Sequence, residues 1–194
     1  MGKLSESCYA FPILGGIIAL ISLVCPAAYY YFQDMGYGIF VWVWGVAIYR
    51  NKGTSRIYFL NTDSSEPVDM FGTEIFGFMI ALITTLAIAI SSLMLIATAQ
   101  KFKHNKINEG TAAKIWAIAA LTIIGASLFW LIAIEYYYGV YTANIDRGYP
   151  SIVKLVFGSE RTKHFSFWSF FNPSFGIVLP LIGAGIALIG IYVK

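Results

Sequence analysis

Apolar residues in this sequence gather into four long stretches, separated by segments that are more polar or aromatic. Each stretch has about the 20 apolar residues that an α-helix needs to cross the hydrocarbon of a bilayer. None has a charged residue at its centre. The stretches cover residues 11–31, 75–98, 115–138 and 175–193. The pattern predicts an all-α membrane bundle of four transmembrane helices, forming one domain over residues 1–194.

The first segment between spans, residues 32–73, contains an apolar run of a different kind. Residues 39–49 are too few to cross a membrane as a helix, and their β-branched and aromatic side chains favour a strand. Residues 51–55 are typical of a turn, and residues 56–60 of a returning strand. We therefore expect an extracellular β-hairpin or small sheet. A re-entrant or fifth membrane helix over residues 38–49 is the alternative.

The second such segment, residues 139–173, is expected to support that hairpin, because an isolated hairpin is marginally stable in water. Residues 152–157 are a candidate strand. The aromatic run at residues 164–171 could cover the sheet, enter the membrane interface or contact a partner.

Lysine and arginine residues indicate how the chain is oriented in the membrane. Six of the 13 basic residues lie near the termini or around the short link between the second and third stretches, together with only two acidic residues. The longer segments on the other side carry seven basic and eight acidic residues. This asymmetry predicts a multi-pass protein of the cell membrane with both termini in the cytoplasm. Charged residues make up only 12% of the chain, about half the usual share in soluble domains.

Small residues recur in the predicted spans at spacings that suit close packing of helices in lipid. In the second stretch a glycine and three hydroxyl residues recur every seven positions, which places them on one helix face. The candidate packing residues are Gly15, Gly16, Gly77, Thr84, Ser91, Thr98, Gly183 and Gly185. A polar conduit is the alternative role of the hydroxyl face. Residues 12–22 and 180–190 are identical at six of 11 aligned positions. This similarity would arise from an inverted repeat, as in transporters, or from the similar low-complexity composition of two apolar helices.

Residues that could carry chemistry are sparse. Glu135 is the deepest charged residue of the predicted spans, so it is a possible ion or polar site, or a residue at the water boundary. His104 and His164 are predicted on opposite sides of the membrane, which argues against a metal site within one chain. The sequence shows no nucleophile with a base, no phosphate-binding loop and no nucleic-acid motif. We therefore expect no catalytic residue, metal or cofactor, and no nucleic-acid partner.

Aromatic residues of the two outer segments are the candidate partner-binding residues, because tryptophan is enriched in binding hot spots. Tryptophan equally anchors proteins at the lipid interface. The candidates are Phe40, Trp42, Trp44, Phe167 and Trp168.

The predicted topology, with Trp42, Val43, Trp44 and Gly45 in its β-rich first outer segment, resembles the claudin and peripheral-myelin-protein superfamily. That family has a tryptophan followed by Gly-Leu-Trp and two disulfide-bonded cysteines there, and this chain lacks both features. The resemblance implies lateral association, cell contact, barrier formation or service as an accessory subunit.

We therefore expect a non-enzymatic adhesion, scaffold or accessory protein. Its expected partners are membrane lipids and either its own copies, in a homo-oligomer, or another membrane protein. The alternative is a small transporter or channel that uses the inverted first and last spans and Glu135.

Overall fold

The computed structural model describes residues 8–32, 37–51, 54–59, 75–145 and 172–192. Its helices are α1 (Ala10–Ser22), α2 (Ile75–Lys103), α3 (Glu109–Ile145) and α6 (Phe175–Tyr192). Its strands are β1 (Ala28–Phe32), β2 (Tyr37–Val41), β3 (Val46–Asn51), β4 (Thr54–Phe59) and β5 (Asn172–Pro173).

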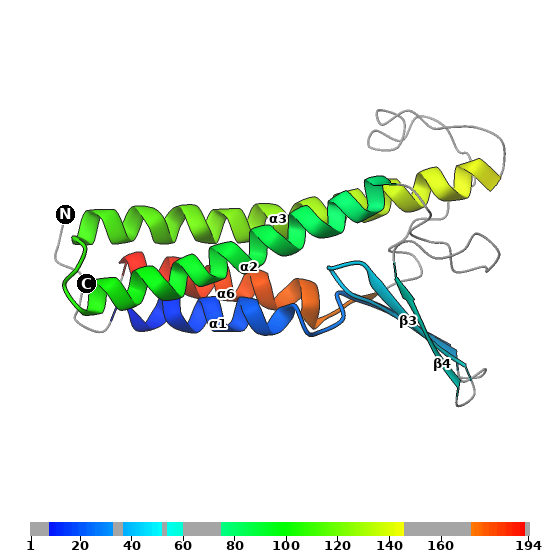
Figure 1. Cartoon of the computed structure of the whole chain (residues 1–194), viewed down its shortest axis with the longest axis horizontal. Coiled ribbons are helices and arrows are strands. Elements are labelled where there is room, and N and C mark those ends of the chain that lie inside the picture. The colour runs from blue at the N-terminus through cyan, green and yellow to red at the C-terminus, as the bar shows by residue number, and fades with distance from the viewer. Residues whose placement is uncertain (1–7, 33–36, 52–53, 60–74, 146–171, 193–194) are drawn as a thin grey trace.

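The helices pack side by side along the long axis of the molecule, and the sheet lies at one end of them (Figure 1). In that view α1 and α6 form one layer, and α2 and α3 form the other. The start of α1, the end of α6 and the α2–α3 link all lie at the end opposite the sheet. The expected arrangement of a helical bundle with a sheet at one end is therefore present.

Three of the helices contain segments that are long and apolar enough to cross a membrane: Ile80–Lys103, Glu109–Glu135 and Phe175–Tyr192. Large apolar side chains such as Leu93 and Ile118 lie exposed on the outer surface of the bundle. Helices that are apolar around their whole circumference are typical of membrane spans when they are not buried in a large core. The chain is therefore a membrane protein with transmembrane helices.

Helix α1 is much shorter than the first predicted span. It has 13 residues and ends at Ser22, so it is about 20 Å long, against about 30 Å of hydrocarbon in a bilayer. The prediction of a helix through residue 31 is wrong. Pro26 disfavours helical backbone at the residue before it, and residues 28–32 pair in the sheet as β1.

The sheet is antiparallel and has the strand order β4-β3-β2-β1-β5. The predicted returning strand is present as β4, because Asn51 at the end of β3 pairs with Thr54 at its start. The turn predicted over residues 51–55 is too long, because residues 51, 54 and 55 belong to the strands, and residues 52–53 lie outside the described residues. The single strand predicted over residues 39–49 is wrong, because it is divided into β2 and β3. The alternative of a membrane helix over residues 38–49 is also wrong.

A tight turn at residues 42–45 divides these two strands, and we call it the Trp turn. The Gly45 N–H donates to the Trp42 carbonyl oxygen at 3.0 Å, and Gly45 has a φ of 87°. Glycine adopts this left-handed conformation without steric cost. Trp42 and Trp44 therefore do not share a strand face with Phe40, as a continuous strand would have required.

The second segment between the predicted spans, residues 139–173, contributes to the sheet at a position that was not predicted. Strand β5 pairs with β1 through Pro173 with Ala28 and Asn172 with Tyr29. The candidate strand at residues 152–157 lies outside the described residues, as do Phe167 and Trp168.

Candidate functional site

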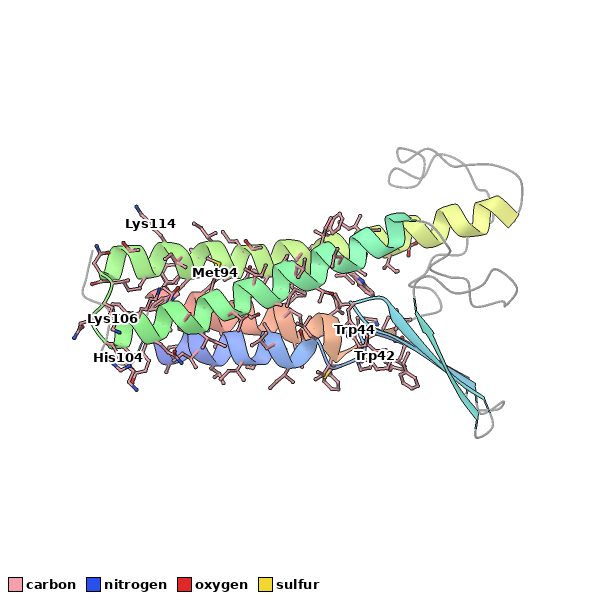
Figure 2. The ribbon with its side chains drawn as sticks, viewed as in Figure 1. Trp42, Trp44, Met94, His104, Lys106 and Lys114 are labelled. Atoms are coloured by element: carbon pink, nitrogen blue, oxygen red, sulfur yellow. The ribbon has the colours of Figure 1, made fainter. Side chains whose placement is uncertain are left out.

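Helix α1, the sheet and α6 meet at residues 23–27, which we call the linker. The Trp44 indole N–H donates to the Leu23 carbonyl oxygen at 2.8 Å, and the Trp42 indole N–H donates to the Val24 carbonyl oxygen at 3.1 Å. The two ring centroids are 6.4 Å apart. Figure 2 shows both side chains where the sheet meets the helices. The Trp turn thus holds the chain directly after α1.

These bonds satisfy carbonyl groups that the end of a helix leaves without partners. The N–H groups of Leu23 and Val24 donate back to Leu20 and Ile21 at 3.1 Å, which tightens the last turn of α1. The carbonyls of Leu23 and Val24 lie beyond this turn and accept from the indoles instead. The two tryptophans therefore cap the C-terminal end of α1.

The other side of the linker is bonded to the start of α6. The Ser174 N–H donates to the Ala27 carbonyl oxygen, and the Gly176 N–H donates to the Pro26 carbonyl oxygen, both at 2.8 Å. A Cβ atom at Gly176 would lie 2.7 Å from the Ala27 nitrogen and would also strike the Cys25 carbonyl oxygen. Only glycine allows this approach of α6 to the linker.

The sheet is joined to the linker as well. The Ala27 N–H donates to the Val41 carbonyl oxygen at 2.7 Å. Val41 and Val43 are almost fully buried and belong to an apolar cluster that includes Ile177 of α6 and Trp130 of α3. Backbone bonds, indole bonds and apolar packing together fix the inner end of the sheet on the bundle.

Three of the predicted packing glycines lie between helices. A Cβ atom at Gly15 would strike the Gly183 carbonyl oxygen, and one at Gly183 would strike the Gly15 carbonyl oxygen. A Cβ atom at Gly16 would lie 2.8 Å from the Ser92 carbonyl oxygen. Gly185 is different, because it is exposed and no atom lies within 4 Å of an added Cβ. The expectation for Gly185 is therefore not met within this chain.

The hydroxyl face of α2 lies in the interior of the bundle. Thr84, Ser91 and Thr98 are buried, and Gly77 lies in a part of α2 whose side chains are not described. The neighbouring Ser92 hydroxyl donates to the Ile88 carbonyl oxygen of its own helix at 2.7 Å. Apolar side chains such as Ile88, Leu95 and Ile123 are buried in the same bundle. The burial of this face among apolar side chains favours packing over a polar conduit, although the Thr84 hydroxyl has no hydrogen-bond partner among the described residues.

The remaining candidates are dispersed. Glu135 is partly buried and ends the apolar segment of α3, and Phe40 is partly buried in β2. His104 lies at the opposite end from the Trp turn, with Lys106 and Lys114 (Figure 2). Within the described residues, no group of three or more histidine, cysteine or acidic residues is placed to hold a metal ion.

Comparison with models of protein families and with curated proteins finds no match to this chain. The resemblance to claudins therefore stays a prediction. Sequence reasoning did not single out the linker, although Pro26 was a visible signal for it. The roles of Gly176 and Ser174 depend on contacts between distant parts of the chain, so no local signal marks them.

Proposed function

We propose that this protein is a four-span membrane protein, with both termini in the cytoplasm, that acts through protein contacts of its sheet. Its role would be that of an adhesion, scaffold or accessory subunit. The observation that carries this proposal is the fixed mounting of the sheet, which is bonded both to the linker after α1 and, through β5, to α6. Recognition benefits when binding residues are carried on rigid elements.

One side of the sheet is the better candidate for these contacts. The register aligns four positions in one cross-strand row, and these are Tyr29, Phe40, Ile48 and Ile57. The adjacent row begins with Ala28 and Val41, which are fully buried against the bundle. Because successive residues of a strand alternate between the two faces of a sheet, the Tyr29 row occupies the face opposite the one that carries Ala28 and Val41. This row is apolar or aromatic at every position.

The test places a charge in this row at Ile57, in the outermost strand, as Ile57→Glu in the full-length chain. We expect the wild-type protein to be recovered from membranes in a particle heavier than one chain, by mass measurement in mild detergent. The variant should associate at least about tenfold more weakly, which corresponds to about 1.4 kcal/mol.

Thr54→Glu is the matched control, because Thr54 lies in the same strand but three positions away, on the opposite face. It adds the same charge and should leave association unchanged. The particle mass also distinguishes self-association from a second protein. Equal effects of the two variants, or a wild-type protein that stays a single chain in membranes, would contradict the proposal.

A further inference from the structure

The linker after α1 lies level with a part of α6 that is expected to be inside the membrane. Gly190 near the end of α6 lies against Cys8 and Pro12, and Gly176 at the start of α6 lies against Pro26 and Ala27. Residues 8–27 therefore extend alongside the whole of the span Phe175–Tyr192. Helix α1 covers only the first part of this length, so the non-helical linker must cover the rest.

Backbone groups in lipid need partners within the protein, because the hydrocarbon offers none and each unsatisfied group costs several kcal/mol. The linker meets this requirement at four of its carbonyl groups. The carbonyls of Leu23 and Val24 accept from the two indoles, and those of Pro26 and Ala27 accept from the start of α6. These four carbonyls therefore need no water, which allows the linker to lie in lipid.

The surface around the linker is apolar as well as exposed. Val24 is 74% exposed, Ile21 is 50% exposed, and Trp44 is 43% exposed although its N–H is bonded inward. Phe175, beside the linker at the start of α6, is 67% exposed. This arrangement directs polar groups into the protein and presents apolar groups outward, which suits contact with lipid.

We propose that α1 and the linker together form a fourth membrane crossing, in which the Trp turn binds the headgroup boundary of the leaflet at the sheet end. The two indoles replace water as donors to the linker, and their rings occupy the layer that tryptophan side chains favour. The inference depends on membrane insertion but not on the protein contacts proposed for the sheet.

The chemistry of this surface identifies the kind of lipid that it binds. No charged residue occurs in residues 10–32, 37–49 or 172–192. Binding is therefore apolar and interfacial, and a zwitterionic phospholipid is sufficient. It should not weaken when the salt concentration is raised, in contrast to binding of anionic headgroups by lysines.

A spin label tests the position of the linker. Its collision rate is measured with oxygen, which partitions into lipid, and with a nickel complex that stays in water. The full-length chain, with Cys8→Ala and Cys25→Ala, would be labelled at Val24→Cys and reconstituted in phosphatidylcholine vesicles. Ile90→Cys, on the exposed face of α2, is the lipid control, and Lys106→Cys, in the α2–α3 link, is the water control. We expect the oxygen-to-nickel ratio at Val24 to lie closer to that at Ile90.

Two other results at Val24 would overturn the proposal. A ratio like that at Lys106 would place the linker in water. Poor collision with both reagents would mean that protein covers this surface instead of lipid. Either result would also remove the fourth span from the proposed topology. The protein contacts proposed for the sheet do not depend on that span, and the Ile57→Glu experiment tests them separately.

The role of the indoles is tested by replacing Trp42 and Trp44 with phenylalanine, which keeps an aromatic ring and removes the donor. Collisions of the Val24 label with the nickel complex should rise several-fold, because water must then satisfy the two carbonyls. Trp116→Phe is the matched control, since the Trp116 indole N–H has no hydrogen-bond partner among the described residues. An unchanged collision rate in the Trp42 and Trp44 variant would exclude the capping role.

Discussion

At the scale of single residues, Trp42 and Trp44 bond to the protein's own backbone, because both indole N–H groups donate to the chain after α1. The Trp44 ring is exposed at the same time, so its role in binding a partner stays a prediction. An indole can bind a partner, lipid or its own backbone, and the sequence did not indicate the third use because it does not place Leu23 and Val24 beside these rings. The roles of Gly15 and Gly183 were easier to predict from the sequence, because a residue without a side chain in a membrane helix has few uses other than close packing.

Substitutions at the glycines of α6 should show this packing directly. Gly183→Ala places a Cβ against the Gly15 carbonyl oxygen, and we expect it to lower the free energy of unfolding by about 1–3 kcal/mol. Gly185→Ala is the control in the same helix, because a Cβ atom added there has no atom within 4 Å. Helix propensity favours alanine over glycine by up to about 1 kcal/mol, so this variant should be at least as stable as the wild type. Thermal unfolding in detergent measures both. Equal stability of the two variants would show that the α1–α6 contact is not tight.

The Cys8 thiol should be unreactive in the folded protein. Burial raises the pKa of this thiol, and the nearby charge of Glu109 raises it further. Because the thiolate is the reactive form, a raised pKa leaves less of the nucleophile at pH 8. We expect iodoacetamide at pH 8 to modify the buried Cys8 only after unfolding. Mass spectrometry of the digested protein locates the modified residue, and early modification of Cys8 would show that its burial is incomplete.

At the scale of elements, proline and glycine residues interrupt runs that look continuous by apolar content. Helix α1 ends at Ser22, four residues before Pro26, within a stretch that hydropathy alone predicts as one span. The turn closed by Gly45 separates β2 from β3 within a run that β propensity alone predicts as one strand. The long helices were predicted well because few residues interrupt them, although α3 extends beyond the predicted end at residue 138 to Ile145. Strand β5 could not be predicted from the sequence. It has only two residues, too few to show the alternation that marks a strand, and it is far from β1 in the sequence.

The Trp turn offers a test at this scale. Gly45→Ala forces a side chain into a φ of 87°, which costs about 1–2 kcal/mol for most residues. Gly45→Asn should cost less, because asparagine adopts this conformation more readily. Thermal unfolding followed by near-ultraviolet circular dichroism should rank the proteins as wild type, then asparagine, then alanine. A variant as stable with alanine as with asparagine would show that the turn has another conformation.

At the scale of the whole molecule, the sequence predicted a bundle with a sheet at one end, and the structure shows this arrangement (Figure 1). Apolar length and turn residues were sufficient for it. The orientation in the membrane depends on the distribution of lysine and arginine, which geometry alone does not test. Association with other chains is equally a property of surfaces and not of the fold.

Labelling in sealed cells tests the orientation. With Cys8→Ala and Cys25→Ala, single cysteines would be placed at Lys103 in the last turn of α2 and at Arg50 in β3. A membrane-impermeant maleimide should label the Arg50→Cys protein in intact cells and the Lys103→Cys protein only after permeabilisation. Labelling of both from the same side would refute the four-span topology and the assignment of the sheet to the outside.

The shortness of α1 has a consequence for the bilayer around the protein. Residues 8–27 and α6 present a thinner apolar band than the 24-residue span Ile80–Lys103 of α2, which is about 36 Å long. Lipid beside α1 and α6 must become thinner, or the whole bundle must tilt, and either response has an energetic cost that increases with acyl-chain length. Thermal stability in vesicles should therefore peak at a chain length matched to the short side.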